Sequence, residues 1–426
     1  MTTHVDPVPI LAGLKDFQRD TVEYVFDQLY GERQARRFLV ADEVGLGKTL
    51  VARGVIAKTI EHLQEKGIKR VDVVYVCSNA DIAKQNINRL NVTRNEEFNL
   101  PTRLTLLPLH LRSIKARDLN FVSFTPGTTF DLKSRGGTAP ERALLFRLVR
   151  YALDRTGLRH RGVYRLLQGG SGYENFRRQV AWTPSEFGDG PDMIDRDLAD
   201  SFVDELRADD ERRRAAEETT IHERFIELSD KLQHSTKDYW HERAEMVGEL
   251  RQLLAKSCVR ALEADLIILD EFQRFRDLLD GDSAAAELAG HLFSEQDART
   301  LLLSATPYKM YTLSDEGDDD HYVDFVRTAR FLIDDGERAE RFDEDLRAFR
   351  RSLLELDADN VDEVLVRKSA VESQLKRVMV RTERLGVTDD RSGMLIDRPS
   401  TGLRLEAADL HGYLTAEKVS RHLGAG

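Results

Sequence analysis

The sequence predicts an α/β protein built on a parallel β-sheet, and four short, mostly apolar runs carry this prediction. They occupy residues 38–40, 71–77, 264–269 and 300–303. Runs of this kind are typical of strands that helices cover on both faces of a sheet. Segments with helical apolar spacing separate the runs, and strands that alternate with helices indicate parallel pairing.

The segments between and after these runs favour helices, with two shorter strands. The short strands are expected near residues 104–107 and at 121–124. Apolar residues recurring every three or four positions indicate an amphipathic helix. On this criterion the sequence predicts helices at 14–30, about 52–63, 81–90, 283–293, 337–356 and 362–384.

From about residue 131 to residue 261 the strand signals vanish, and long charged segments with helical spacing replace them. We therefore predict a helical insertion in the α/β unit. Residues 141–178 of this insertion contain nine arginines interleaved with aromatic residues. Such a stretch can contact nucleic acid, or it can form a helical core with a salt-bridged face, and the sequence leaves both open.

The expected organisation has four parts. Residues 10–130 form the first part of the α/β unit and residues 262–335 its second part, with the insertion at 131–261 between them. Residues 336–426 form a helical segment.

Composition narrows the class of protein. The chain of 426 residues is 41% hydrophobic with a net charge of −12, and this acidity argues against passive, charge-driven binding to nucleic acid. No apolar run reaches the ~18–20 residues that a membrane helix needs. Cys77 and Cys258 both lie in apolar settings, which predicts buried thiols and a reducing, cytoplasmic location. The eleven histidines lack ligand-type spacing, so a metal hydrolase is disfavoured.

The most informative segment lies between the first strand and the helix that follows it. A strand, a glycine-bearing turn ending in Gly-Lys-Thr and a helix form an arrangement that cradles nucleotide phosphates with backbone N–H groups. Lys48 then reaches the β- and γ-phosphates, and the Thr49 hydroxyl binds Mg²⁺. The general pattern has a glycine where this chain has Asp42. The predicted phosphate loop comprises Asp42, Glu43, Val44, Gly45, Leu46, Gly47, Lys48 and Thr49.

Two more strand ends carry polar residues. Asp270 and Glu271 follow one apolar run, and Ser304-Ala305-Thr306 follows another. Because ligands bind at the carboxyl ends of parallel strands, these residues can meet the phosphate loop. Asp270 suits the carboxylate that holds Mg²⁺, and Glu271 suits the base that orients and deprotonates the attacking water. An Asp-Glu pair alone often just ends a strand.

This ordered set resembles the first RecA-like lobe of superfamily 2 helicases and translocases, and most closely the switch/sucrose-nonfermenting remodeller ATPases. Their phosphate loop commonly reads Asp-Glu-x-Gly-Leu-Gly-Lys-Thr, which residues 42–49 match. The resemblance implies a RecA-like P-loop fold with ATP and Mg²⁺ as cofactors. It also implies that Gln18 hydrogen-bonds the adenine.

The resemblance further implies contacts with nucleic acid, with DNA favoured over RNA. Thr125, Gly127 and Thr128 resemble the family's grip on the phosphate backbone, although a simple Pro-Gly turn explains them as well. Ser304 and Thr306 match a motif that couples the nucleotide state to this grip. Gln273 stands where the family has His or Asp, the residue that makes its usual coupling contacts. Residues 378–384 resemble the helix that leads into a second lobe.

After the Ser-Ala-Thr motif we find no strand that carries the arginines of a second RecA-like lobe, so we expect this lobe in cis or from a partner chain. Arginines from a facing lobe are worth ~10³–10⁵ in rate in related chemistry. The chain alone is therefore expected to bind ATP and to hydrolyse it slowly. One alternative is a nucleotide-binding switch or scaffold subunit of a defence or remodelling complex. A weaker one is a small-molecule kinase.

Overall fold

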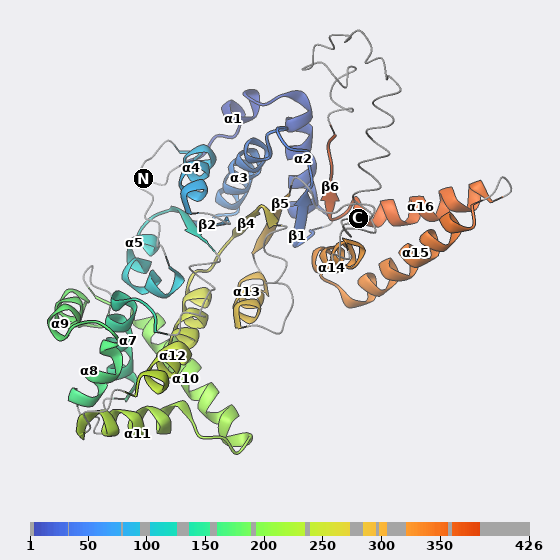
Figure 1. Ribbon diagram of the computed structural model, residues 1–426. Helices are drawn as coiled ribbons and strands as arrows, with labels where there is room; N and C mark the ends of the chain where they lie inside the picture. The colour runs from blue at the N-terminus through green and yellow to red at the C-terminus, as the bar shows by residue number, and fades with distance from the viewer. Residues whose placement is uncertain are drawn as a thin grey trace, which may run out of the picture. The chain divides into compact units, whose positions relative to one another are not determined.

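The computed structural model describes residues 4–32, 34–77, 80–93, 103–125, 136–153, 160–188, 193–234, 239–272, 284–294, 298–304, 321–356 and 360–383. The chain divides into two compact units, Met1–Thr382 and Glu383–Gly426. Of the second unit only Glu383 is described. Every described helix and strand belongs to the first unit (Figure 1).

Six described strands form one sheet in which every pair is parallel, which confirms the predicted α/β class. Their spatial order is β3-β2-β4-β5-β1-β6. Asp270 lies opposite Leu303, and Leu303 lies opposite Val40, so three neighbouring strands end level with one another. The strands are β1 (Arg37–Val40), β2 (Val71–Val76), β3 (Leu119–Phe124), β4 (Leu266–Asp270), β5 (Arg299–Leu303) and β6 (Met379–Val380).

Successive residues of a strand point to opposite faces, and both faces of this sheet are buried. In β1, Phe38 and Val40 pack into one hydrophobic core, whereas Leu39 packs into the other. The first core contains residues of α2 (Asp16–Tyr30), α3 (Lys48–Glu65) and α4 (Ala80–Leu90), with α1 (Val8–Ala12) packed against it. The second core contains residues of α5 (Leu111–Lys115) and α13 (Ala284–Ser294) and of the helices between β3 and β4.

Where the structure describes it, the segment between β3 and β4 is helical, as the sequence predicts. Its core is continuous with the second core of the sheet, because α12 packs against α13 and the α7 side chains join the same cluster. Apart from one isolated bridge between Phe187 and Ile194, no strand pairing occurs in its described part. The helices are α7 (Ala139–Leu153), α8 (His160–Gln168), α9 (Tyr173–Trp182), α10 (Arg196–Ala215), α11 (Ile221–His234) and α12 (Trp240–Ala261).

Several arginines of the arginine-rich stretch bind main-chain carbonyl groups inside this helical segment. Arg142 donates to the carbonyl oxygens of Gly136 and Gly137, Arg147 to that of Val180, and Arg165 to that of Leu232. Phe176 is fully buried and packs against the ring of Tyr164. For these residues the interpretation as a helical core therefore holds. The aromatic residues Tyr173 and Trp182 of α9 are exposed.

The most deeply buried ion pair among the described residues of the segment joins α7 to α12. Arg251 Nη2 lies 3.0 Å from Glu141 Oε1, and the two side chains are 1% and 0% exposed. Glu141 also accepts hydrogen bonds from the hydroxyl groups of Thr105 and Thr138 and from the backbone N–H of Thr138, and Arg103 lies 3.6 Å away. Burial favours the neutral acid, but Arg251 and these hydrogen bonds hold the pKa of Glu141 below its ordinary value.

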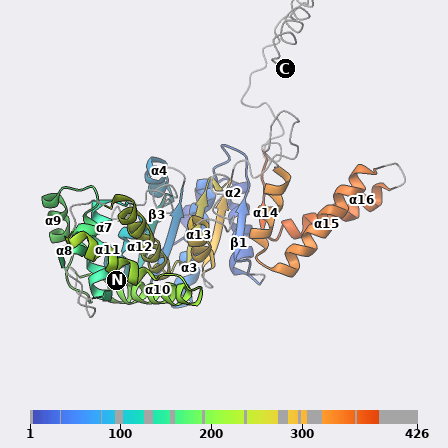
Figure 2. The same ribbon diagram turned by 60° about the horizontal axis from the view of Figure 1, so that its bottom comes forward.

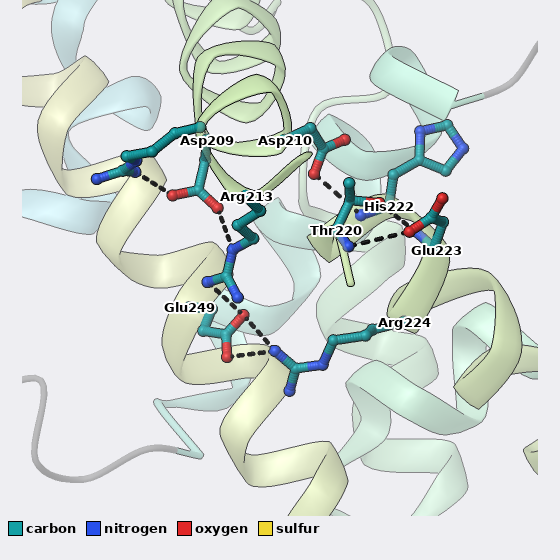
Figure 3. Close-up of polar contacts among 9 residues, drawn as sticks. Asp209, Asp210, Arg213, Thr220, His222, Glu223, Arg224 and Glu249 are labelled. Atoms are coloured by element: carbon teal, nitrogen blue, oxygen red, sulfur yellow. Dashed lines mark hydrogen bonds and ion pairs between the residues drawn. The ribbon is translucent and has the colours of Figure 1, made fainter. Parts of the chain in front are cut away.

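Polar contacts fix the corner where α10, α11 and α12 meet (Figure 3). Glu249 of α12 accepts from Arg224 of α11 at 2.8 Å and from Arg213 of α10 at 3.4 Å. Thr220 and Glu223 exchange hydrogen bonds in a capping box that begins α11. Charge pairs between neighbouring helices therefore stabilise the insertion in addition to its apolar core.

Between β5 and β6 the structure describes three helices: α14 (His321–Ile333), α15 (Gly336–Leu354) and α16 (Val361–Leu375). Helix α14 packs against β1, and α15 packs against α16 (Figure 2). The expected helix at 362–384 is wrong beyond Leu375, because Met379 and Val380 form β6 beside β1. The helix that the resemblance implies at 378–384 is therefore also wrong. The sequence did not predict α14.

The short strand expected near residues 104–107 is also wrong. This segment is a 3₁₀ helix, η1 (Leu104–Leu109), with Pro108 inside it. Leu104 and Leu107 are both buried in the second core. Their spacing of three residues places them on one side of a helix with three residues per turn, which a short apolar run does not distinguish from a strand.

Two expectations from composition can be compared with the structure. Cys77 and Cys258 are buried thiols that form no disulfide with each other, as predicted. In the described ranges, each helix is too short or too polar to cross a bilayer.

The contact between α8 and α11 offers a test of the insertion's packing. An added Cβ at Gly162 would lie 2.1 Å from the carbonyl oxygen of Ser229. We expect Gly162→Ala to lower the free energy of unfolding by about 1–3 kcal/mol, because the two helices must separate. Urea titration checks this. Gly290→Ala is the control, because an added Cβ meets nothing within 4 Å there. Equal effects of the two substitutions would contradict the predicted clash.

Candidate functional site

The loop between β1 and α3 has the backbone of an anion-binding turn. Gly45 and Gly47 have φ values of 87° and 85°, a region that glycine adopts without strain. Helix α3 begins directly afterwards at Lys48. Among the described residues, no acceptor is found for the backbone N–H groups of Gly45, Gly47, Lys48 and Thr49. Unpaired amides at a helix N-terminus, with two glycines in this conformation, form a concave site for anions.

Gln18 supports this loop from α2. Its side chain is buried, donates to the carbonyl oxygen of Leu46 at 2.9 Å and accepts from the backbone N–H of Lys15 at 3.0 Å. An added Cβ at Gly47 would lie 2.5 Å from Gln18 Nε2. Gln18 thus stabilises the loop from inside the protein, through hydrogen bonds between its side-chain amide and the main chain.

Lys48 lies over the beginning of the loop. Its Nζ donates to the carbonyl oxygens of Asp42 at 2.9 Å and Glu43 at 3.1 Å. Burial lowers the pKa of Lys48, and the carboxylates of Asp42 and Asp270 act in the opposite direction. The electrostatic effect of Asp270 on Lys48 links the end of β4 to the phosphate loop.

Asp42 occupies the position where the general pattern has glycine, and its side chain is fully buried. Its Oδ1 accepts from the backbone N–H of Thr382 at 2.8 Å, and the Thr382 carbonyl accepts from Glu43 N at 3.1 Å. Burial raises the pKa of Asp42, while the Thr382 hydrogen bond and Lys48 lower it. Asp42 therefore attaches the loop to the segment that follows β6.

Asp270 ends β4 two strands away from β1, with its carboxylate held on both oxygens. Oδ2 accepts from the Tyr75 hydroxyl at 2.5 Å and from Asn86 Nδ2 at 3.1 Å, and Oδ1 accepts from Glu271 N at 2.9 Å. Burial raises the pKa of Asp270, and the hydrogen bonds from Tyr75, Glu271 N and Asn86 oppose this. The sequence did not predict Tyr75 or Asn86 as site residues.

Glu271 has a φ of 55°, in the left-handed region that non-glycine residues rarely adopt. Such a conformation costs of order 1–3 kcal/mol and is concentrated at functional sites. Phe272, the bulky residue that follows, is buried and stacks on Phe331 of α14 with ring centroids 6.4 Å apart. Phe272 therefore fills the core under α14.

A cavity of about 470 Å³ lies beside the first turn of α3. Such a volume is within the range of about 300–1,000 Å³ typical of small-molecule sites. Arg53 Nε is buried and has no hydrogen-bond partner in the described part of the chain. Sequence reasoning did not find this cavity, because its wall comes from three separate segments. Lining residues include His4, Asp6, Leu14, Leu50, Arg53 and Thr93.

The other predicted site residues divide into two groups. Ser304 is buried, and its N–H donates to the Val40 carbonyl at 3.0 Å, beside the phosphate loop. Thr125 follows β3 at the same end of the sheet, but β2, β4 and β5 separate it from β1. The predicted residues outside the described part of the chain are Gly127, Thr128, Gln273 and Thr306.

The described residues contain no group of three or more His, Cys, Asp or Glu side chains arranged for a metal ion. Mg²⁺ is usually bound by one or two carboxylates with substrate phosphates and water, so it does not require such a group. Thr49, at the start of α3, and Asp270 provide a hydroxyl and a carboxylate of the kind that Mg²⁺ prefers. The donor set therefore fits this ion.

No protein-family model matches the chain, and a search of the curated proteins finds no match. The assignment of a function therefore depends on the site itself.

Proposed function

We propose that this chain is the ATP-binding and ATP-hydrolysing lobe of a superfamily 2-type helicase or translocase, with a RecA-like P-loop fold. One observation carries the proposal. An anion-binding loop with a lysine follows β1, and an Asp-Glu pair follows β4 at the same end of the sheet. Helix α3, which follows β1, packs in one core, and α14, which comes after β5, packs in the other. The chain therefore leaves these two neighbouring strands toward opposite faces of the sheet. At such a position, called a topological switch point, α/β sheets bind ligands.

Each residue then has a defined task. The N–H groups of the loop and of the first turn of α3 bind the phosphates, and Lys48 leaves the loop carbonyls to neutralise their charge. Thr49 and Asp270 hold Mg²⁺, which when bound neutralises charge on the phosphate oxygens. Glu271 orients the attacking water and accepts its proton.

The cavity beside α3 is suited to the nucleobase and ribose. It adjoins Leu50, two residues after Lys48, so it lies next to the helix turn that would bind the phosphates. Arg53, Asp6 and Thr93 supply polar groups there. Because the Gln18 amide binds the main chain, we assign base contacts to the cavity and give Gln18 a supporting role.

The partners belong to the same proposal. Nucleic acid, with DNA favoured over RNA, binds along the end of the sheet where Thr125 and Ser304 lie, and a second RecA-like lobe in cis or from a partner supplies arginines. We assign the chain to the cytoplasm. The alternative, a nucleotide-binding switch or scaffold, predicts ATP binding without acceleration by nucleic acid. ATP turnover with single-stranded DNA, duplex DNA and RNA, compared at one salt concentration, separates the two.

Lys48→Ala tests the nucleotide site. We expect it to weaken ATP binding by about 10- to 100-fold, which corresponds to the loss of a hydrogen bond between charged groups. Titration with a fluorescent ATP analogue measures the effect. Lys58→Ala is the matched control, because Lys58 lies in the same helix and pairs with Glu23 at the surface. Absence of ATP binding by the unaltered protein, or equal affinities of the two variants, would overturn the proposal.

A further inference from the structure

We propose that Tyr75 and Asn86 are positioning residues for Mg²⁺, because they occupy Oδ2 of Asp270 and leave Oδ1 to face the cation. This inference rests on the proposed ATP site. Tyr75 belongs to β2, which neighbours β4, and Asn86 belongs to α4. Neither residue lies in the loop at residues 42–49 or in the Asp270-Glu271 pair, from which the nucleotide site was predicted.

The hydrogen bonds determine which oxygen is available. A carboxylate offers about four lone-pair positions, two on each oxygen. The Tyr75 hydroxyl and Asn86 Nδ2 fill both positions on Oδ2, at 2.5 and 3.1 Å. Glu271 N fills one position on Oδ1 at 2.9 Å. Within the described residues, the remaining position on Oδ1 is therefore the one open to a cation or to a water bound to it.

The two donors are themselves fixed. Tyr75 is 1% exposed and packs in the first hydrophobic core, and Asn86 is 9% exposed. Asn86 Nδ2 also donates to the Tyr75 hydroxyl oxygen at 2.9 Å. Because the hydroxyl oxygen accepts from Asn86, its own proton points toward Asp270 Oδ2. The three side chains form a closed set, and the orientation of the carboxylate is set before any ligand arrives.

Such pre-organisation matters for Mg²⁺ in particular. This ion requires near-ideal octahedral geometry, so a carboxylate that rotates freely binds it poorly. Removing the hydrogen-bonding partner of a metal ligand typically weakens metal binding by 10- to 100-fold. Tyr75 and Asn86 are expected to affect metal affinity in this way without touching the nucleotide.

Tyr75→Phe tests the inference. Mn²⁺, whose binding can be followed by electron paramagnetic resonance, serves as the probe in the presence of ADP. We expect the Mn²⁺ affinity to fall by about 10-fold or more, while ADP affinity in EDTA stays within about twofold, because the phosphate loop is unchanged. Tyr24→Phe is the control, since Tyr24 donates to the Lys376 carbonyl at 2.6 Å on an exposed part of the protein.

A double substitution separates positioning from a general structural effect. In an Asp270→Asn background, Tyr75→Phe should no longer change Mn²⁺ affinity, because Tyr75 acts only through the carboxylate. A similar loss in both backgrounds, or unchanged affinity in Tyr75→Phe alone, would overturn the inference. Failure of the unaltered protein to bind ADP in EDTA would instead overturn the proposed function, so the two failures are distinguishable.

Discussion

Replacing Glu271 with glutamine is expected to lower the rate of ATP hydrolysis by about 10²- to 10⁴-fold, the usual contribution of a general base. The amide keeps nearly the same shape but cannot accept the proton of the attacking water. ATP affinity should change little, because the loop amides and Lys48 are untouched. Single-turnover hydrolysis of labelled ATP, with nucleic acid present, measures the rate, and titration with an ATP analogue measures the affinity.

Glu263→Gln is the matched control for this experiment. Glu263 lies just before β4, where Glu271 lies just after it, and both have a positive φ, of 44° and 55°. Glu263 pairs with Arg70 at the opposite end of the strand, away from the phosphate loop. Its substitution should leave hydrolysis unchanged. If Glu271→Gln hydrolyses ATP as fast as Glu263→Gln, Glu271 is not the base.

The second large effect concerns stability. Glu141→Ala is expected to lower the free energy of unfolding by about 3–5 kcal/mol, because it leaves the buried guanidinium of Arg251 without its counter-charge. The pair joins α7 to α12, and Arg251 is 1% exposed, so water cannot replace the lost carboxylate easily. Chemical denaturation, followed by circular dichroism, measures the change.

Two further variants show whether the lost charge pairing is the cause. Glu174→Ala removes an exposed ion pair with Arg177 at 3.8 Å, and such pairs are worth about 0–1 kcal/mol. Replacing Glu141 and Arg251 together, as Glu141→Leu with Arg251→Met, should recover part of the loss, since no unpaired charge remains. If the double variant is no more stable than Glu141→Ala, loss of packing and of the threonine hydrogen bonds accounts for the effect.

The sequence predicted well those features that depend on neighbouring residues. The strands β1, β2, β4 and β5 are short apolar runs because both faces of the sheet are buried, and this pattern is visible without any partner. The loop with Gly45 and Gly47 is contiguous as well, and so is the Asp270-Glu271 pair. Each of these could be located from local pattern alone.

Features that depend on distant contacts were missed. Strand β6 has two residues, and its position beside β1 determines its conformation more than its own sequence does. Tyr75 contacts Asp270 across 195 residues, and Asp42 contacts Thr382 across 340. No local periodicity reports such pairs. The hydrogen bond from Gln18 to the carbonyl oxygen of Leu46 likewise joins residues that are 28 positions apart.

The contact between Asp42 and Thr382 has a consequence for biosynthesis. The loop at residues 42–49 is synthesised early, but Thr382, whose backbone N–H donates to Asp42, is added 340 residues later. Until then β1 lacks the neighbour that Met379 and Val380 provide, and a buried carboxylate lacks its donor. Pairing over such a separation is slow, because a long stretch of chain must be ordered first. During synthesis, the hydrogen bond between Thr382 and Asp42 can therefore form only after the whole first unit has been made.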